Sequence, residues 1–254
     1  MLNAMYIAAI GLQAEKEQLD ASANNFANMN TTAYKRQSVD FSAILDRVPS
    51  GRGLVSMTTP DATPDRLMRV DMTPGTLQAT GRTLDIAIDG AGFIEVDLPD
   101  GKTGYVRGGS LQTNADGGLS LASGQALKTD LRIPSTATNV QIAADGSITA
   151  TLTPNGQPVQ LGQIEVATFA NPETLQYGGD GIFTAPEGGA DPVRARPGID
   201  GASMLAPGNL EGSNVQMTNE MVSLMLTERI YELNSHVLQV ADEMMSMANN
   251  MRHS

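Results

Sequence analysis

The side chains that could carry catalytic chemistry are few in this chain. Its two histidines, His236 and His253, both fall in a C-terminal stretch with helical periodicity, and cysteine is absent. A Ser-His-Asp triad or a zinc site would have to use one of these histidines, and neither has a second ligand nearby in the sequence. His236 lies on the polar side of the expected helix. We therefore expect a solvated histidine rather than a catalytic base.

Three further groups of residues resemble functional sites only in part. Gly90-Ala91-Gly92 is followed by a strand pattern rather than a helix. Because a phosphate-binding loop needs the N-terminus of a helix, we do not expect one here. Asn114, Asp116 and Gly117 open like a calcium loop that lacks its closing glutamate. Sugar hydrolysis would need two carboxyls in one cleft. The available carboxyls are Asp85, Asp89, Glu95 and Asp97. We expect these to be solvated, and we predict no enzyme activity, no metal site and no cofactor.

Composition excludes several classes of partner. The chain has 254 residues and a formal net charge of −12, which disfavours nucleic acid and anionic membrane surfaces. It has no apolar run long enough for a transmembrane helix and no cleavable signal pattern. We therefore predict no membrane insertion and an N-terminus that stays in the mature chain. With 14 methionines, no tryptophan and few aromatics, the core should be aliphatic and methionine-rich.

The strongest pattern is an apolar heptad repeat near the C-terminus. It predicts a long helix with one stripe that faces a partner helix. This C-terminal stripe consists of Leu226, Ile230, Leu233, Val237, Val240, Met244, Met247 and Met251. A second stripe on the same helix consists of Met217, Met221, Leu224, Tyr231, Leu238 and Met245. Two stripes on one helix predict burial from two directions, against the chain itself and against neighbouring molecules.

The N-terminal residues carry a matching repeat. This N-terminal stripe consists of Leu2, Met5, Ala9, Leu12, Lys16, Leu19, Ala23 and Phe26. Lys16 is its polar member, and its aliphatic stem can lie along the stripe while the amine reaches water. We expect the two ends to pair in an antiparallel or staggered coiled coil. The alternative is an ordinary helical hairpin that closes a monomeric domain, which would leave the second stripe without a partner.

Between the two ends the pattern changes to β. Leu84, Ile86 and Ile88 alternate with less apolar residues, and Pro99-Asp100-Gly101 is a hairpin turn signal. We predict an α+β fold in which terminal helices form a coiled-coil domain with an inserted all-β domain. The helical domain should comprise residues 1–30 plus 216–254, an extended linker 31–75 plus 206–215, and the β-rich outer domain 76–205.

Several motifs together resemble the bacterial flagellar rod and hook family of axial proteins. A-N-N-F-A-N-M-N-T-T-A-Y-K-R (23–36) is similar to the N-terminal signature of that family, and L-E-G-S-N-V (210–215) to its C-terminal signature. L-D-I-A-I-D-G-A-G-F (84–93) and Y-V-R-G-G-S-L (105–111) resemble the start of its central β domain. The family usually has glycine where this chain has Ala33. With alanine there, we expect the turn to adopt another geometry.

The resemblance implies a non-enzymatic subunit of the flagellar basal-body rod in the periplasm. Such proteins leave the cytoplasm through the flagellar type III export machinery without signal cleavage and polymerise helically, with the terminal helices lining the tube. The implied partners are further copies of the chain, other rod proteins and hook-side axial proteins. The ring proteins that surround the rod are a further candidate contact.

Within the family we favour the proximal rod protein, with the distal rod protein as the alternative. A different class, a β-rich binding or adhesion module on a helical hairpin, would need an aromatic platform on the β domain. A rod-associated enzyme that cleaves peptidoglycan would need a carboxylate pair in a cleft. For the rod subunit, the expected assembly interface consists of Leu2, Met5, Leu12, Leu19, Phe26, Asn24, Asn25, Asn28, Asn30, Tyr34, Met221, Leu224, Leu226, Ile230, Tyr231, Leu233, Val237, Leu238, Val240, Met244, Met247 and Met251.

Overall fold

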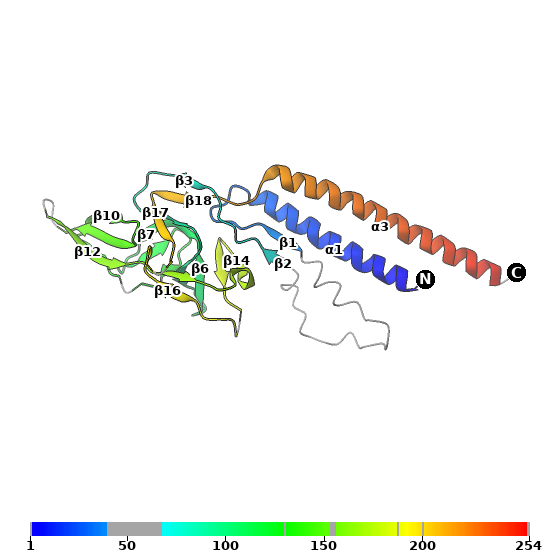
Figure 1. Ribbon diagram of the computed structural model, residues 1–254, viewed down its shortest axis with the longest axis horizontal. Helices are drawn as coiled ribbons and strands as arrows, with labels where there is room; N and C mark the ends of the chain where they lie inside the picture. The colour runs from blue at the N-terminus through cyan, green and yellow to red at the C-terminus, as the bar shows by residue number, and fades with distance from the viewer. Residues whose placement is uncertain are drawn as a thin grey trace. The chain divides into compact units, whose positions relative to one another are not determined.

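The chain is an α+β protein that divides into two compact units (Figure 1). The computed structural model describes residues 2–39, 68–129, 131–152, 156–186, 188–199 and 201–252. The helical unit comprises residues 1–28, 37–71 and 215–254, and the β unit comprises residues 29–36 and 72–214. Most of the predicted linker segment 31–75 lies outside the described residues, as do the side chains of residues 2–10.

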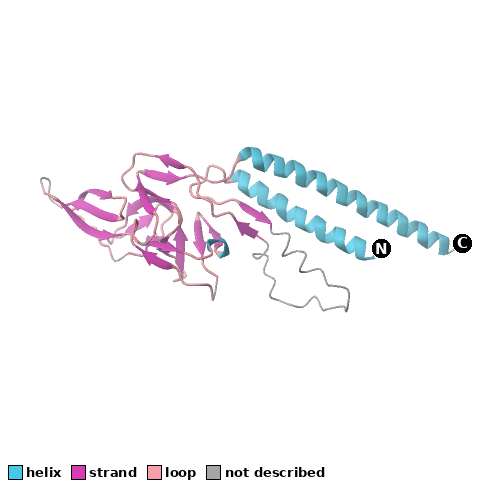
Figure 2. Ribbon diagram, in the orientation of Figure 1, coloured by secondary structure: helices cyan, strands magenta, loops and turns pink. Residues whose placement is uncertain are grey.

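The helical unit contains two long helices, α1 (Leu2–Ala27) and α3 (Met217–Arg252), among its described residues (Figure 2). A short antiparallel pair, β1 (Gln37–Val39) and β2 (Met68–Val70), lies in the same unit. The predicted helix end near Asn28 is confirmed, because the Asn28 side chain donates to the carbonyl of Asn24 at 2.9 Å and satisfies a terminal backbone group. Neither of these helices is long and apolar enough to cross a membrane.

The β unit is built around a nine-stranded antiparallel sheet. In spatial order its strands are β14 (Gln176–Gly179), β15 (Ile182–Thr184), β6 (Thr103–Val106), β5 (Ile94–Asp97), β9 (Ala126–Leu127), β8 (Leu119–Leu121), β7 (Gly108–Thr113), β4 (Asp85–Asp89) and β17 (Met204–Pro207). Smaller sheets pair β10 (Thr138–Ile142), β11 (Ser147–Thr151) and β12 (Pro158–Gln163), then β13 (Val166–Thr168) with β16 (Val193–Ala195), and β3 (Leu77–Ala79) with β18 (Asn209–Glu211). A short 3₁₀ turn covers Pro172–Thr174.

The core of the β unit follows from the alternation in the sequence. Ile86 and Ile88 of β4 are fully buried, and the predicted turn at residues 99–101 is confirmed, with Gly101 at a φ of 78°. The core is aliphatic as expected, built from isoleucine, leucine and valine. The expectation that it is also methionine-rich is wrong, since no methionine is among the buried apolar residues of the described chain.

Residues 29–36 of the N-terminal signature and 210–214 of the C-terminal signature belong to the β unit, whereas sequence analysis assigned most of these residues to a linker. Residues 29–36, 72–75 and 206–214 all lie in that unit. The reason is backbone pairing: the amide of Ala33 donates to the carbonyl of Glu211 at 2.8 Å, and β18 pairs with β3. Segments from both ends of the chain are thereby hydrogen-bonded to the strands between them.

Ala33 adopts the left-handed conformation that glycine would favour. Its φ is 57° and it is buried. The expectation of another turn geometry is therefore wrong. The surrounding hydrogen bonds and packing hold the alanine in a conformation that costs an L-residue about 1–2 kcal/mol.

We expect Ala33→Gly to stabilise the β unit by about 0.5–1 kcal/mol, because it removes this strain at a small entropic cost. Ala143→Gly is the matched control, since Ala143 is exposed and has an ordinary φ. The control should lower the free energy of unfolding slightly. Urea unfolding followed by circular dichroism measures both, and a loss of stability in Ala33→Gly would contradict the strain.

Candidate functional site

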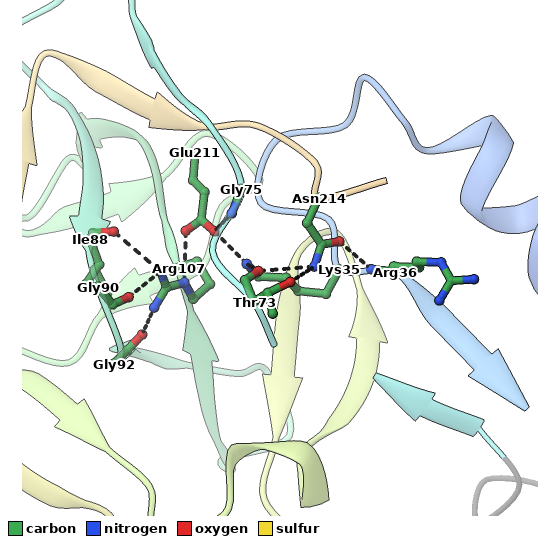
Figure 3. Close-up of polar contacts among 10 residues, drawn as sticks. All are labelled: Lys35, Arg36, Thr73, Gly75, Ile88, Gly90, Gly92, Arg107, Glu211 and Asn214. Atoms are coloured by element: carbon green, nitrogen blue, oxygen red, sulfur yellow. Dashed lines mark hydrogen bonds and ion pairs between the residues drawn. The ribbon is translucent and has the colours of Figure 1, made fainter. Parts of the chain in front are cut away.

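The carboxylate of Glu211 is the centre of a buried ion network in the β unit (Figure 3). One of its oxygens accepts hydrogen bonds from Nζ of Lys35 at 2.5 Å and from the amide of Gly75 at 2.8 Å. The other oxygen accepts from Nε of Arg107 at 2.9 Å. All three charged side chains are at most 3% exposed. The network therefore joins the N-terminal signature, the C-terminal signature and the central sheet.

Backbone carbonyls surround the guanidinium of Arg107. It donates to the carbonyl oxygens of Gly92 at 2.6 Å, Gly90 at 2.7 Å and Ile88 at 3.4 Å. Gly90 and Gly92 have φ values of 123° and 137°, which L-residues rarely adopt. A Cβ at Gly90 would also lie 2.4 Å from the hydroxyl of Ser203. The Gly90-Ala91-Gly92 motif is thus a carbonyl cage for an arginine.

Lys35 and Asn214 tie the same segments together at a second point. Nζ of Lys35 donates to the carbonyl of Thr73 at 2.6 Å, and the side-chain amide of Asn214 donates to that carbonyl at 3.1 Å. The Asn214 side-chain oxygen accepts from the amide of Arg36 at 2.7 Å. Three chain segments distant in sequence therefore meet around Thr73.

This crossing depends on glycine at one position. A Cβ at Gly75 would lie 2.0 Å from the carbonyl oxygen of Gly212. The backbone amide of Gly212 also donates to the carbonyl of Thr76 at 2.8 Å. The segment that carries Gly75 can approach the C-terminal signature this closely only without a side chain.

In the helical unit, α1 and α3 pack antiparallel through a polar ladder. Its pairs are Asn25 with Glu220 at 3.3 Å, Ser22 with Ser223 at 3.4 Å, and Glu15 with Asn234 at 2.6 Å, all between side-chain atoms. Along the ladder the α1 numbers fall as the α3 numbers rise, which defines the antiparallel register.

Small residues bring the two helices close together around the ladder. Ala14 and Ala21 are buried, and a Cβ at Gly11 would lie 3.3 Å from the side-chain nitrogen of Asn234. Asn25 also bonds both the amide and the carbonyl of Gln37, at 2.8 and 2.7 Å, and so attaches β1 to α1. Over the described side chains, the face between the helices is therefore mainly polar and small rather than apolar and large.

The C-terminal stripe faces away from α1. Its exposed members, between 37% and 66% exposed, are Leu226, Ile230, Leu233, Val237, Val240, Met244 and Met247. The side chain of Met251 lies outside the described residues. The two ends do pair in antiparallel fashion, as expected, but the expectation that they pair through their apolar stripes is wrong over the described side chains. The short ladder residues permit the closer approach, and they leave the larger apolar side chains outside.

The N-terminal stripe is also uncovered over its described part. Leu19 and Phe26 are each 37% exposed, Lys16 and Ala23 are exposed, and Leu12 is half-buried. The side chains of its earlier members, Leu2, Met5 and Ala9, are not described. On each helix, the stripe lies about a quarter of a turn around the helix axis from the ladder residues. Viewed along the pair from one end, both stripes are rotated away from the ladder in the same direction. The two stripes therefore face opposite sides of the antiparallel pair.

The second stripe of α3 is split between the two environments. Leu224 and Leu238 are half-buried beside the ladder, whereas Met217, Met221 and Tyr231 are 43%, 42% and 46% exposed. The side chain of Met245 is not described.

The predicted interface residues of the N-terminal signature also divide. Asn24 and Asn30 are exposed and Asn28 is half-buried. Asn25 and Tyr34 are fully buried, and Tyr34 packs edge-on against Tyr177 with ring centroids 5.6 Å apart. In the free chain these two residues hold their own units together rather than present a surface.

Sequence reasoning singled out none of the charged residues at the centre of these contacts. Lys35, Arg107 and Glu211 each lie inside a motif that carried the family resemblance, and a charge next to a tyrosine or a glycine was the available signal. Glu220 lies in the stretch that follows the C-terminal signature and also resembles the family, whereas Glu15 had no such signal. They are acidic residues whose partners lie at the opposite end of the chain.

Of the carboxyls considered for chemistry, Asp89 and Asp97 are exposed as expected. The expectation that Asp85 and Glu95 are solvated is wrong, because both are buried with structural partners. Glu95 accepts from Nε of Arg194 at 2.8 Å, and Asp85 accepts from the hydroxyls of Ser110 and Thr80 at 2.5 and 2.7 Å. The Asn114 side chain accepts from two backbone amides of its own turn. Within the described residues, no three acidic or histidine side chains converge as metal ligands.

Uncovered apolar stripes on long paired helices are typical of proteins that assemble with further molecules.

Three family models match the chain in order. "Flagella basal body rod protein" matches residues 5–35, "Flagellar hook protein FlgE/F/G D1 domain" matches 87–150, and "Flagellar basal body rod FlgEFG protein C-terminal" matches 206–251.

Relatives match over nearly the full length of the chain. The flagellar basal-body rod protein FlgG of Buchnera aphidicola (from Acyrthosiphon pisum) is 32% identical over 99% of this chain and 100% of its own. FlgG of Agrobacterium fabrum is 34% identical over 98% of each chain, and that of Caulobacter vibrioides is 33% identical over 99% of this chain and 100% of its own. The chain therefore belongs to the flagellar basal-body rod protein family, whose members are structural subunits of the rod and not enzymes.

We expect Glu211→Gln to destabilise the β unit by about 3–5 kcal/mol, because it leaves two buried cations without their counter-charge. Glu232→Gln is the matched control, since Glu232 pairs with Arg229 at 3.0 Å on an exposed face of α3. Urea unfolding followed by circular dichroism measures both. Equal stability of Glu211→Gln and the unsubstituted chain would show that the network contributes little.

Glu15 should make the helix pair sensitive to pH. Burial raises the pKa of the Glu15 carboxyl above its ordinary value, against the opposing effect of the hydrogen bond from Asn234. The folded state therefore holds this proton more tightly than the unfolded state does. The contribution of this proton to the free energy of unfolding is fully present below the ordinary glutamate pKa of about 4.3. It is lost as pH rises through the pKa of Glu15 in the folded state.

We expect Glu15→Gln to remove this part of the pH dependence and to leave the helix pair more stable than the unsubstituted chain at neutral pH. Thermal unfolding followed at a helical circular dichroism band between acidic and neutral pH measures the effect. Glu17→Gln, two residues away on α1, should keep the original pH profile. Identical profiles for Glu15→Gln and the unsubstituted chain would refute the role of Glu15.

Proposed function

We propose that this chain is a rod subunit of the distal type, which polymerises helically through the uncovered stripes of α1 and α3. Sequence analysis favoured the proximal type. The three relatives reported above are named FlgG, the distal rod protein, and they support the alternative instead. Under this proposal the terminal helices form the inner part of the rod and the β unit its outer part.

The C-terminal stripe is the observation that carries the proposal. It leaves seven large apolar side chains between 37% and 66% exposed along one face of α3. Covering the exposed half of such a side chain contributes about 1 kcal/mol. Stripes that face opposite sides of the helix pair also suit head-to-tail contacts, which generate open helical assemblies rather than closed dimers.

The partners in this proposal are further copies of the chain, neighbouring rod proteins and hook-side axial proteins. Export through the type III machinery and contacts with the surrounding rings remain predictions from the family resemblance. A gold label on the chain in isolated basal bodies tests the distal assignment, which requires the label in the half of the rod next to the hook. A label next to the inner membrane would restore the proximal assignment.

The aromatic residues of the β unit argue against the binding-module alternative. Phe93, Tyr105 and Phe183 are at most 5% exposed. Phe169 and Tyr177 pack against them with ring centroids between 4.8 and 5.9 Å apart. These rings form a packed cluster rather than an exposed platform for a sugar.

We expect Val237→Asp to abolish rod assembly, because a carboxylate in a covered apolar stripe costs several kcal/mol at every subunit contact. Gln239→Asp is the matched control: Gln239 is exposed on the same helix but lies on neither the stripe nor the ladder. A strain that lacks the native chain and carries each variant gives the readout, in motility and in isolated basal bodies. Circular dichroism of each purified variant checks that the β unit still folds. Normal assembly of Val237→Asp would contradict the proposal.

A further inference from the structure

In most helix pairs, apolar side chains lie between the helices and polar side chains face the solvent. The described contacts between α1 and α3 show the opposite arrangement. Among the described residues, polar side chains bridge the two helices, whereas the large apolar side chains of the C-terminal stripe lie outside; Leu224 and Leu238 are half-buried beside the ladder. Glu15 and Asn25 are 6% and 0% exposed, and Glu220 is 0% exposed. Burying such groups costs stability relative to apolar residues of similar size. An apolar face between the helices would bind more tightly, so tight binding alone does not explain the ladder.

Polar groups between helices discriminate between alternative partners and registers. A buried polar side chain tolerates only positions that supply its hydrogen bond, whereas apolar side chains accept many. Shifting α3 by one heptad would place Ala241, in place of Asn234, opposite Glu15. The carboxylate would then lose the 2.6 Å hydrogen bond from the Asn234 side chain. Its second oxygen, Oε2, is already buried without a hydrogen-bond partner among the described residues.

The apolar stripes do not discriminate between partners or registers in this way. The described part of the C-terminal stripe consists of leucine, isoleucine, valine and methionine only, repeated every seven residues. A stripe of this kind pairs with similar free energy in several registers, and it pairs with other apolar helices as well. Without a second criterion, α1 could pair with the stripe of its own chain and remove it from assembly.

We propose that the polar ladder selects α1 of the same chain as the partner of α3 and fixes its register, so that both apolar stripes stay uncovered for other copies. The selection and the register follow from the helix pair alone. The use of the stripes by other copies rests on the proposed rod function.

Disulfide trapping tests the register in the full-length chain, which contains no cysteine of its own. Ser22→Cys with Ser223→Cys reports the native register, because the two hydroxyls lie 3.4 Å apart. Ser22→Cys with Ile230→Cys reports a shift of one heptad. With the ladder intact, we expect the native pair to form its intramolecular disulfide at least about tenfold faster than the shifted pair.

Glu15→Leu with Asn234→Leu removes one step of the ladder and adds apolar surface, so the helices should still form. In this background we expect the preference for the native register to fall to about threefold or less, and disulfides between chains to increase. Glu17→Leu with Glu228→Leu is the matched control, which places two leucines on the same helices away from the ladder. The control should keep the tenfold preference.

Two results would overturn the proposal: a native preference that survives the loss of Glu15 and Asn234, or the same loss of preference in the control. The trapping needs no rod assembly, so it separates this proposal from the proposed function. If Val237→Asp assembles normally while the trapping behaves as expected, the rod proposal fails and the ladder stands.

Discussion

The fold of the β unit depends on the burial of one carboxylate. Glu211 compensates the charges of Lys35 and Arg107 in a site with almost no solvent, and without it both would be buried cations that lack a counter-charge. Because Lys35 precedes the central strands and Glu211 follows them, the ion network can form only when both signature segments are in place. The glycines at positions 75, 90 and 92 give the backbone the close approach and the carbonyl directions that the network requires.

In the helical unit, polar side chains make the contacts between the two helices, and apolar side chains form the surfaces available to other molecules. Hydrogen bonds between short polar side chains hold α1 to α3, whereas the apolar stripes lie on the outer faces. Hydrogen bonds are directional and suit a contact that must form in one way within one chain. Apolar contacts gain free energy in proportion to the area covered, which suits an interface repeated many times in a polymer. This separation lets the same pair of helices fold in the free chain and still offer a surface for assembly.

Local patterns predicted the elements of the fold, but long-range contacts had to come from the structure. Heptad and alternating patterns place the two helices and strands such as β4 correctly, because they depend on neighbours a few residues apart. The pairing of Glu15 with Asn234 spans most of the chain and leaves no local trace. The apolar stripes were recognised, but the expectation that they pair with each other was wrong. Periodicity shows that a face is apolar and does not show what covers it. Ala33 keeps its left-handed conformation because tertiary contacts override the preference of the residue.

Methionine oxidation tests most directly whether the C-terminal stripe is covered in the rod. Met244 and Met247 of the stripe are 49% and 57% exposed in the free chain, and Met204 of the β unit is 51% exposed. Hydrogen peroxide should convert all three to sulfoxide in the free chain. In isolated rods we expect Met244 and Met247 to react at least about tenfold more slowly than in the free chain, since covered thioethers are shielded from the oxidant. Equal rates for these two methionines in the free chain and in the rod would show that the stripe stays exposed after assembly, and the account of α3 as the assembly surface would be wrong.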